Sequence, residues 1–179
     1  MSCALNHPAA DMTLVDLESG EEIRLLELVE RSAKPTILLF YATWSKACVA
    51  EAEMMEAWSK DGHHKLANFV LVSLDQNIGE TLAFLDQVNP TTNLPRVCRN
   101  YCHGETPTVQ HFGCNEVPEP YGVQRVPHKV VIDKDGIVRR SNDDFHWDDV
   151  AGLLRHRHEE RAKVEENTIS SFLFPSIAT

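Results

Sequence analysis

The stretch "TILLFYATWSKACVAEAEMMEAWSK", residues 36–60, changes from one secondary-structure pattern to another within a few residues. It begins with a short apolar run rich in strand-forming residues, which is typical of a strand buried on both faces. After Trp44 the sequence becomes rich in Ala, Glu and Met, which favour a helix, and Ser45 is well placed as its N-cap. The stretch therefore predicts a buried strand, a turn and a helix in direct succession.

Strand and helix patterns alternate through the rest of the chain. Apolar and polar residues alternate around Ser19–Gly20, which predicts an N-terminal hairpin within residues 12–25. An Asp-Gly turn predicts a second hairpin within residues 128–140. Further elements are expected at residues 25–33 (helix), 68–75 (strand), 79–88 (helix) and 146–166 (helix). This order predicts an α/β domain with a mixed sheet, in which residues 91–120 are less regular.

The composition is ordinary for a soluble globular chain of 179 residues, but the net charge of −10 is informative. Nucleic-acid binding needs clustered Lys and Arg, so this charge argues against nucleic acid as a partner. No run approaches the roughly 18 apolar residues that a membrane helix needs. The N-terminal residues lack a basic segment followed by an apolar core, so we expect a cytoplasmic protein. An organelle or a cytoskeletal assembly stays open.

Five cysteines, an odd number, suggest mostly reduced thiols rather than a disulfide framework. Three of them cluster, because Cys98, Cys102 and Cys114 are interspersed with His103 and His111. This group could bind zinc or contain a disulfide, although its spacing differs from the common Cys-x2-Cys knuckles. Separate core or surface thiols are the preferred interpretation, so we expect no metal and no cofactor.

Three motifs together resemble the thioredoxin-like fold: the strand-Trp-turn-helix of residues 36–60, "FVLVSLD" and "YGVQRVPHKVVIDKDGIVRR". The branch that the chain most resembles is the TlpA/ResA and alkyl-hydroperoxide-reductase-like group, with tryparedoxin-like proteins nearby. The resemblance spans residues 12–155. It implies a central mixed sheet flanked by helices, with an N-terminal hairpin, an insertion at about 91–120 and a C-terminal helical extension. Residues 1–11 would then be a flexible N-terminus.

The resemblance implies that Val126–Pro127 is a cis-proline bond facing the turn at Trp44. Such a bond would present the backbone of Val126 as a strand edge with which a substrate or partner peptide could pair. A trans proline in an ordinary loop is the alternative. His128 departs from the family, which usually has a small or β-branched residue at this position.

The resemblance also locates a redox site at Ser45, Cys48 and Glu51. In the family, a cysteine at the position of Ser45 attacks a disulfide, because the helix N-terminus stabilises its thiolate. A serine hydroxyl does not ionise near neutral pH, and no adjacent residue looks like an activating base. Cys48 matches the resolving cysteine, and Glu51 matches the acidic residue beside the active cysteines. Each of these residues also has a simple structural interpretation. Ser45 would be a helix cap, Cys48 a small core residue and Glu51 part of a solvated face.

The last part of the chain, residues 156–179, lies outside the resemblance. Charged residues at helical spacing predict a helix running into solvent, followed by the apolar tail "SFLFPSIAT" with Phe172 and Phe174. The tail could be disordered, fold back on the domain or dock on another protein.

Two functions fit these observations. The first is a redox-inactive protein-binding module or subunit, whose partner would contact Trp44, the proline loop of Val126 and Pro127, residues 91–120 or the tail. The second is a thiol-disulfide oxidoreductase whose attacking cysteine has been replaced by Ser45, or which acts with Cys48 alone. A natural Ser45 would make the chain a degenerate redoxin, whereas a deliberate Cys-to-Ser substitution would have silenced an enzyme. We expect the first, so the chain is predicted not to be an enzyme.

Overall fold

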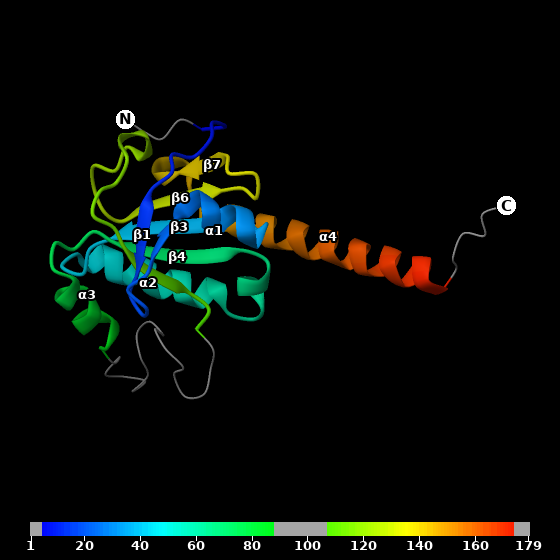
Figure 1. Cartoon of the computed structure of the whole chain (residues 1–179), viewed down its shortest axis with the longest axis horizontal. Coiled ribbons are helices and arrows are strands. Elements are labelled where there is room, and N and C mark those ends of the chain that lie inside the picture. Colours follow the sequence, from blue (N-terminus) through cyan, green and yellow to red (C-terminus); the bar gives the residue numbers. More distant parts are fainter. Residues whose placement is uncertain (1–4, 88–106, 174–179) are drawn as a thin grey trace. The chain divides into compact units, whose positions relative to one another are not determined.

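The computed structural model describes residues 5–87 and 107–173. The chain forms two compact units, residues 1–145 and residues 146–179. The first unit contains a seven-stranded sheet with helices on both faces (Figure 1). None of the helices in the described ranges is long and apolar enough to cross a membrane.

The sheet has the strand order β2-β1-β5-β4-β3-β6-β7. Its centre is parallel, because β4 pairs in parallel with both β3 and β5, and all other pairs are antiparallel. The strands are β1 (Thr13–Asp16), β2 (Glu22–Arg24), β3 (Thr36–Tyr41), β4 (Asn68–Ser73), β5 (Gln110–Gly113), β6 (His128–Ile132) and β7 (Val138–Ser141). All residues of β3 and β4 are buried, as expected for strands covered on both faces.

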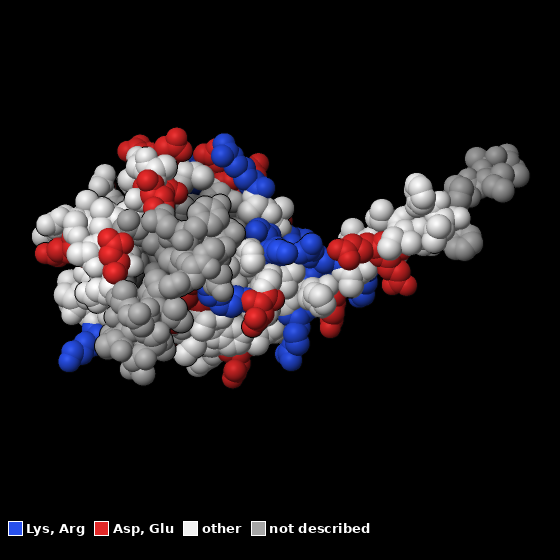
Figure 2. Space-filling view, turned by 90° about the horizontal axis from the view of Figure 1, so that it is seen from below, with Lys and Arg blue, Asp and Glu red and all other residues white. Residues whose placement is uncertain are grey.

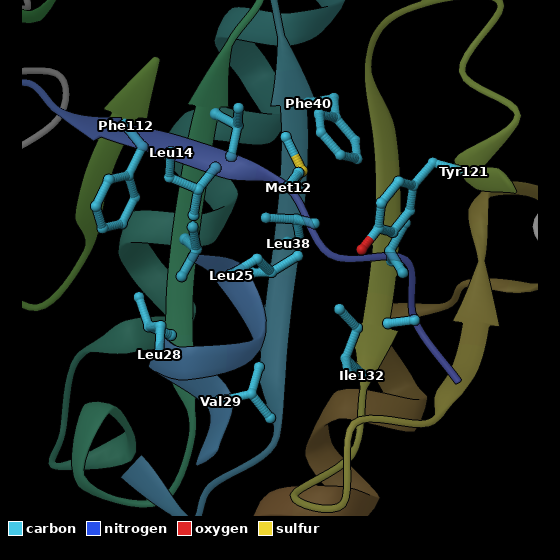
Figure 3. Close-up of a cluster of buried hydrophobic side chains, with 14 of the residues drawn as sticks. Met12, Leu14, Leu25, Leu28, Val29, Leu38, Phe40, Phe112, Tyr121 and Ile132 are labelled. Atoms are coloured by element: carbon cyan, nitrogen blue, oxygen red, sulfur yellow. The ribbon is translucent and has the colours of Figure 1, made fainter. Parts of the chain in front are cut away.

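Four α-helices are described: α1 (Leu25–Ser32), α2 (Lys46–Ser59), α3 (Ile78–Leu85) and α4 (Trp147–Leu173). Three short 3-10 turns lie at His63–Lys65, Glu119–Tyr121 and Asn142–Asp144. In the first unit, α1 covers one face of the sheet, and α2 covers the other (Figure 3). The second unit contains α4 alone among the described elements.

Side-chain alternation along β3 produces two apolar layers. Leu38 and Phe40 point into the core on the α1 side, where they meet Leu25 and Val29 of α1 (Figure 3). Tyr121 joins this layer, with its ring 5.7 Å from that of Phe40. The odd-numbered side chains of β3 face the opposite layer, where the Tyr41 ring lies 6.2 Å from that of Phe84 of α3.

The structure differs from the sequence expectations in three places. Residues 91–120 were expected to be less regular, but Gln110–Gly113 forms β5 between β1 and β4. The final helix runs to Leu173 rather than to residue 166. The segment before β1, expected to be flexible, forms backbone hydrogen bonds to Gly136 and Val138 from its described part. Residues 88–106 lie outside the described ranges.

Candidate functional site

The turn between β3 and α2 presents Ser45 at the start of the helix. Ser45 has an extended backbone, with φ −97° and ψ 118°, and its Oγ accepts the backbone N–H of Cys48 at 3.4 Å. This bond satisfies one of the N–H groups that a helix start leaves without a partner, so the predicted N-cap is confirmed. Among the described residues, no side chain accepts a hydrogen bond from this hydroxyl.

Cys48 lies behind the turn, on the buried side of α2. Its side chain has no exposed surface, and its Sγ is 3.5 Å from the backbone N–H of Ala42. A thiol in this position is out of reach of a disulfide in solution, because attack requires an accessible thiolate. Ser45 and Cys48 lie close together, with Ser45 as the cap of α2 and Cys48 as a core residue.

The Val126–Pro127 peptide bond is cis, which confirms the expectation from the resemblance. The loop leads directly into β6, and the pairing of Phe40 with His128 places it at the end of β3 where the Trp44 turn begins. Val126 and Pro127 are both partly exposed. Within residues 5–87 and 107–173, no hydrogen bond involves the backbone of Val126.

Glu51 is neither a solvated residue nor a free acid beside Cys48. Its Oε2 lies 3.1 Å from Nζ of Lys129, with 27% of the Glu51 side chain and 16% of the Lys129 side chain exposed. The same Nζ lies 5.0 Å from the centre of the Phe145 ring. Glu51 therefore joins α2 to β6 through a partly buried ion pair.

His128 occupies a buried position at the start of β6. Its ring lies 6.1 Å from the Phe40 ring, and its Nε2 is 3.5 Å from Oγ of Ser141. Burial lowers the pKa of His128, against the opposing charge of Asp143. A neutral imidazole therefore fills the place where the family has a smaller side chain.

Sequence reasoning missed Asp75, which follows β4 and anchors the Trp44 turn. Its Oδ1 accepts the backbone N–H of Thr43 at 3.0 Å, and its Oδ2 accepts the hydroxyls of Thr43 at 2.9 Å and Thr81 at 2.7 Å. Burial, reinforced by the nearby charge of Asp75, raises the pKa of Tyr41. The available signal was an acidic residue directly after a buried strand, at the edge of the sheet where β3 also ends.

A groove lies between the turn and α3. Its volume is about 660 Å³, and it is lined by Thr43, Trp44, Lys46, Val49, Glu80, Ala83, Phe84 and Gln87. The Trp44 side chain is 76% exposed, which is unusual for the largest apolar residue type. The groove has apolar side chains on both walls and one charge of each sign, from Lys46 and Glu80.

The described end of α4 is a second exposed apolar feature. Residues 167–173 carry no charge, and Figure 2 shows this end of the helix in white. Ile169, Phe172 and Leu173 are 59%, 85% and 62% exposed. Their i, i+3 and i+4 spacing puts them on one side of the helix. Phe174, the other predicted contact residue of the tail, lies outside the described residues.

Of the clustered cysteines, only Cys114 is described, and it is a free, partly buried thiol. Burial raises its pKa to about 11. Cys98 and Cys102 lie outside the described residues. Within 5–87 and 107–173, no group of three or more His, Cys, Asp or Glu side chains is placed to hold a metal ion.

The model of the AhpC/TSA family matches residues 5–141, which include the turn, Asp75 and the proline loop. The chain belongs to the AhpC/TSA family. No curated protein sequence matches this family member. Solved structures resemble it in fold.

Three solved structures illustrate this likeness. A protein from Chlorobium tepidum assigned as thiol:disulfide interchange protein DsbE is 20% identical with a TM-score of 0.64, over 87% of this chain and 99% of that one. The thioredoxin domain of a thiol-disulfide oxidoreductase from Bacteroides vulgatus is 17% identical with a TM-score of 0.62, over 86% and 99%. A secreted disulfide oxidoreductase from Mycobacterium tuberculosis, homologous to E. coli DsbE, is 19% identical with a TM-score of 0.54, over 80% and 94%. The predicted thioredoxin-like α/β fold is thereby confirmed.

Proposed function

We propose that this AhpC/TSA family member is a redox-inactive protein-binding module or subunit. The observation that supports this most directly is the state of the two redox positions. The oxygen of Ser45 caps α2, and the sulfur of Cys48 has no exposed surface. A two-thiol cycle needs an accessible thiolate at the first position and a second thiol to resolve the mixed disulfide. Ser45 does not meet the first requirement, because it carries a hydroxyl group in place of the attacking thiol.

The partner would be a protein segment that binds along the turn. Trp44 offers a large exposed apolar contact, and the groove beside it continues to Phe84 of α3. The open backbone of Val126 offers hydrogen bonds to an extended peptide, as in recognition by strand addition. The groove and the strand edge thus complement one another, since side chains would fill the first while the peptide backbone pairs with the second.

We further propose that domain boundaries follow the resemblance, with residues 12–155 as the binding domain and 156–179 as a second contact. The exposed apolar residues near the end of α4 support a docking role for that segment. Residues 91–120 are proposed as a protein-specific contact. The free thiols of Cys48 and Cys114 support a reducing compartment, and we propose the cytoplasm.

A second function is favoured by a specific observation. The start of α2, the turn before it and the proline loop lie at the same end of β3, as an active site of this family would require. The chain could therefore be a thiol-disulfide oxidoreductase in which Ser45 replaces the attacking cysteine. In this alternative, replacing the side-chain oxygen of Ser45 with sulfur would restore activity.

Ser45→Cys separates the two functions. We expect this variant to reduce insulin disulfides no faster than Ser45→Ala, its matched control, in the presence of dithiothreitol. Catalytic turnover by Ser45→Cys alone would overturn the redox-inactive module and support the oxidoreductase. Free thiols in the variant would be counted first, so that a disulfide between the introduced thiol and Cys48 is not mistaken for an inactive site.

Partner binding is tested separately by capture with immobilised full chain. Wild type would be compared with Trp44→Ala, and with Met54→Ala as the control, because Met54 is 44% exposed on α2 but outside the groove. We expect some proteins captured by wild type to be captured by Met54→Ala but not by Trp44→Ala. This result should be the same in reducing and in oxidising buffer. Identical capture by all three proteins would contradict the groove as a binding site.

A further inference from the structure

We propose that Asp75 is a positioning residue that holds the two walls of the Trp44 groove at a fixed separation. This inference rests on the proposed function, because a fixed groove matters only if the groove binds a partner. One wall is the turn after β3 with the start of α2, and the other is α3. Neither wall is a strand, so the hydrogen bonds of the sheet do not join them.

The carboxylate of Asp75 joins these walls directly. Its Oδ2 lies 2.9 Å from Oγ1 of Thr43, in the first wall, and 2.7 Å from Oγ1 of Thr81, on α3. An ionised carboxylate has no proton to donate, so both hydroxyls must donate to it. Bonds of this kind are stronger than those between neutral groups. One oxygen atom therefore connects the turn to the helix.

The chain of hydrogen bonds continues from Thr81 to Ser73, the last residue of β4. Thr81 uses its only hydroxyl proton on Asp75, so the hydroxyl of Ser73, 2.8 Å away, must donate to Thr81. The Ser73 oxygen accepts the backbone N–H of Asp75 at 3.1 Å. Thr81 has no exposed surface and Ser73 is 2% exposed, so water does not compete for these bonds. The hydroxyl groups of Thr81 and Ser73 therefore each donate one hydrogen bond and accept another. They link Asp75 to β4, a central strand of the sheet.

Asp75 reaches the rim of the groove through Thr43. This residue is held twice, by its backbone N–H and by its hydroxyl, and it directly precedes the exposed Trp44. On the other wall, Thr81 follows Glu80, which lines the groove. Asp75 is not among the lining residues, so it acts on the groove only by positioning its walls.

The experiment cuts the connection on one side. Thr81→Val removes the hydroxyl and keeps the branched shape, whereas Thr81→Ser keeps the hydroxyl. Thr36→Val is the matched control, because Thr36 is also fully buried and its hydroxyl accepts a hydrogen bond from Asn68 elsewhere in the sheet. The readout is the NMR order parameter of the Trp44 backbone amide in the free, full-length chain.

We expect this order parameter to fall from about 0.85 to below about 0.6 in Thr81→Val, and to stay unchanged in Thr81→Ser and Thr36→Val. An unchanged value in a folded Thr81→Val, or an equal fall in Thr36→Val, overturns the proposal. If Thr81→Val does not fold, Thr43→Val cuts the other hydroxyl and is judged by the same values. Since no partner is present in the measurement, this inference and the proposed function can fail independently.

Discussion

The ammonium group of Lys129 lies 3.1 Å from the carboxylate of Glu51. This pair connects the helix that begins at Ser45 with the strand that follows Pro127. The acidic residue of the predicted redox site thus has a structural partner.

Removing one member of this pair takes away the opposite charge that the other, partly buried, member has at 3.1 Å. We expect Lys129→Met to lower the free energy of unfolding by about 1–2 kcal/mol, between the values for exposed and for buried pairs. Glu51→Gln should cost a similar amount, and the double variant less than the sum. Urea unfolding measures all three, with the exposed Lys134→Met as the control. Additive effects would contradict an energetic coupling between the two residues.

The cap of α2 gives a second prediction. Ser45→Ala removes the acceptor for the Cys48 N–H and should lower the free energy of unfolding by about 0.5–1 kcal/mol, the lower part of the range for caps because the bond is 3.4 Å long. Ser45→Asp should restore the loss, since a carboxylate caps a helix and is favoured at its N-terminus. Thermal unfolding followed by circular dichroism provides the comparison. Equal stability of Ser45→Ala and wild type would show that the cap contributes nothing.

The pH dependence of stability follows from His128. Its pKa is lower in the folded chain than the usual 6.5, so the unfolded chain binds more protons in the interval below 6.5. Stability should therefore fall as the pH drops from about 7 through that interval, with a contribution of at most about 1.4 kcal/mol per pH unit from this residue.

Urea unfolding at pH values between about 7.5 and about 5.5 measures this slope, and His128→Val is the comparison. The free energy of unfolding should change less steeply with pH in His128→Val, because the variant lacks the imidazole that binds protons differently in the folded and unfolded chain. The carboxyl groups of Asp11 and Asp133 also have lowered pKa values in the folded chain, but their contribution is lost only at more acidic pH. An identical slope in His128→Val and wild type would refute the assignment.

Alkylation of the native chain tests the two described thiols. Cys48 should react with iodoacetamide at least about a hundredfold more slowly than in urea, because its side chain has no exposed surface. Cys114 should also react slowly at about pH 8 and become faster as the pH approaches its pKa of about 11. Mass spectrometry of the peptides separates these sites from the other cysteines. Rapid labelling of native Cys48 would argue for an accessible thiolate and against the redox-inactive module.

Local patterns made much of this fold predictable. The strand, turn and helix from residue 36 to residue 60 were predicted because the change from a continuous apolar run to helix-forming residues is contained in the stretch itself. The Ser45 cap depends on only a few neighbouring residues. The cis bond before Pro127 came from the family resemblance, not from physical reasoning about the residues.

Features that depend on distant residues were missed. β5 has only four residues, two of them the polar Gln110 and His111, and it is a strand because it pairs with β1 and β4. The role of Asp75 needs Thr43 and Thr81, which no local pattern associates. Similarly, α4 continues to Leu173 through Asn, Thr and Ser residues of low helix propensity, beyond the predicted end at residue 166.

The position of β5 has a consequence for synthesis on the ribosome. Val15 of β1 pairs with Gly113 of β5, a strand made roughly a hundred residues later, and this pairing is how the N-terminal hairpin joins the sheet. A nascent chain that has not yet released β5 therefore lacks the strand that links this hairpin to the rest of the sheet. Chaperones that bind exposed apolar strands would find their target in this interval.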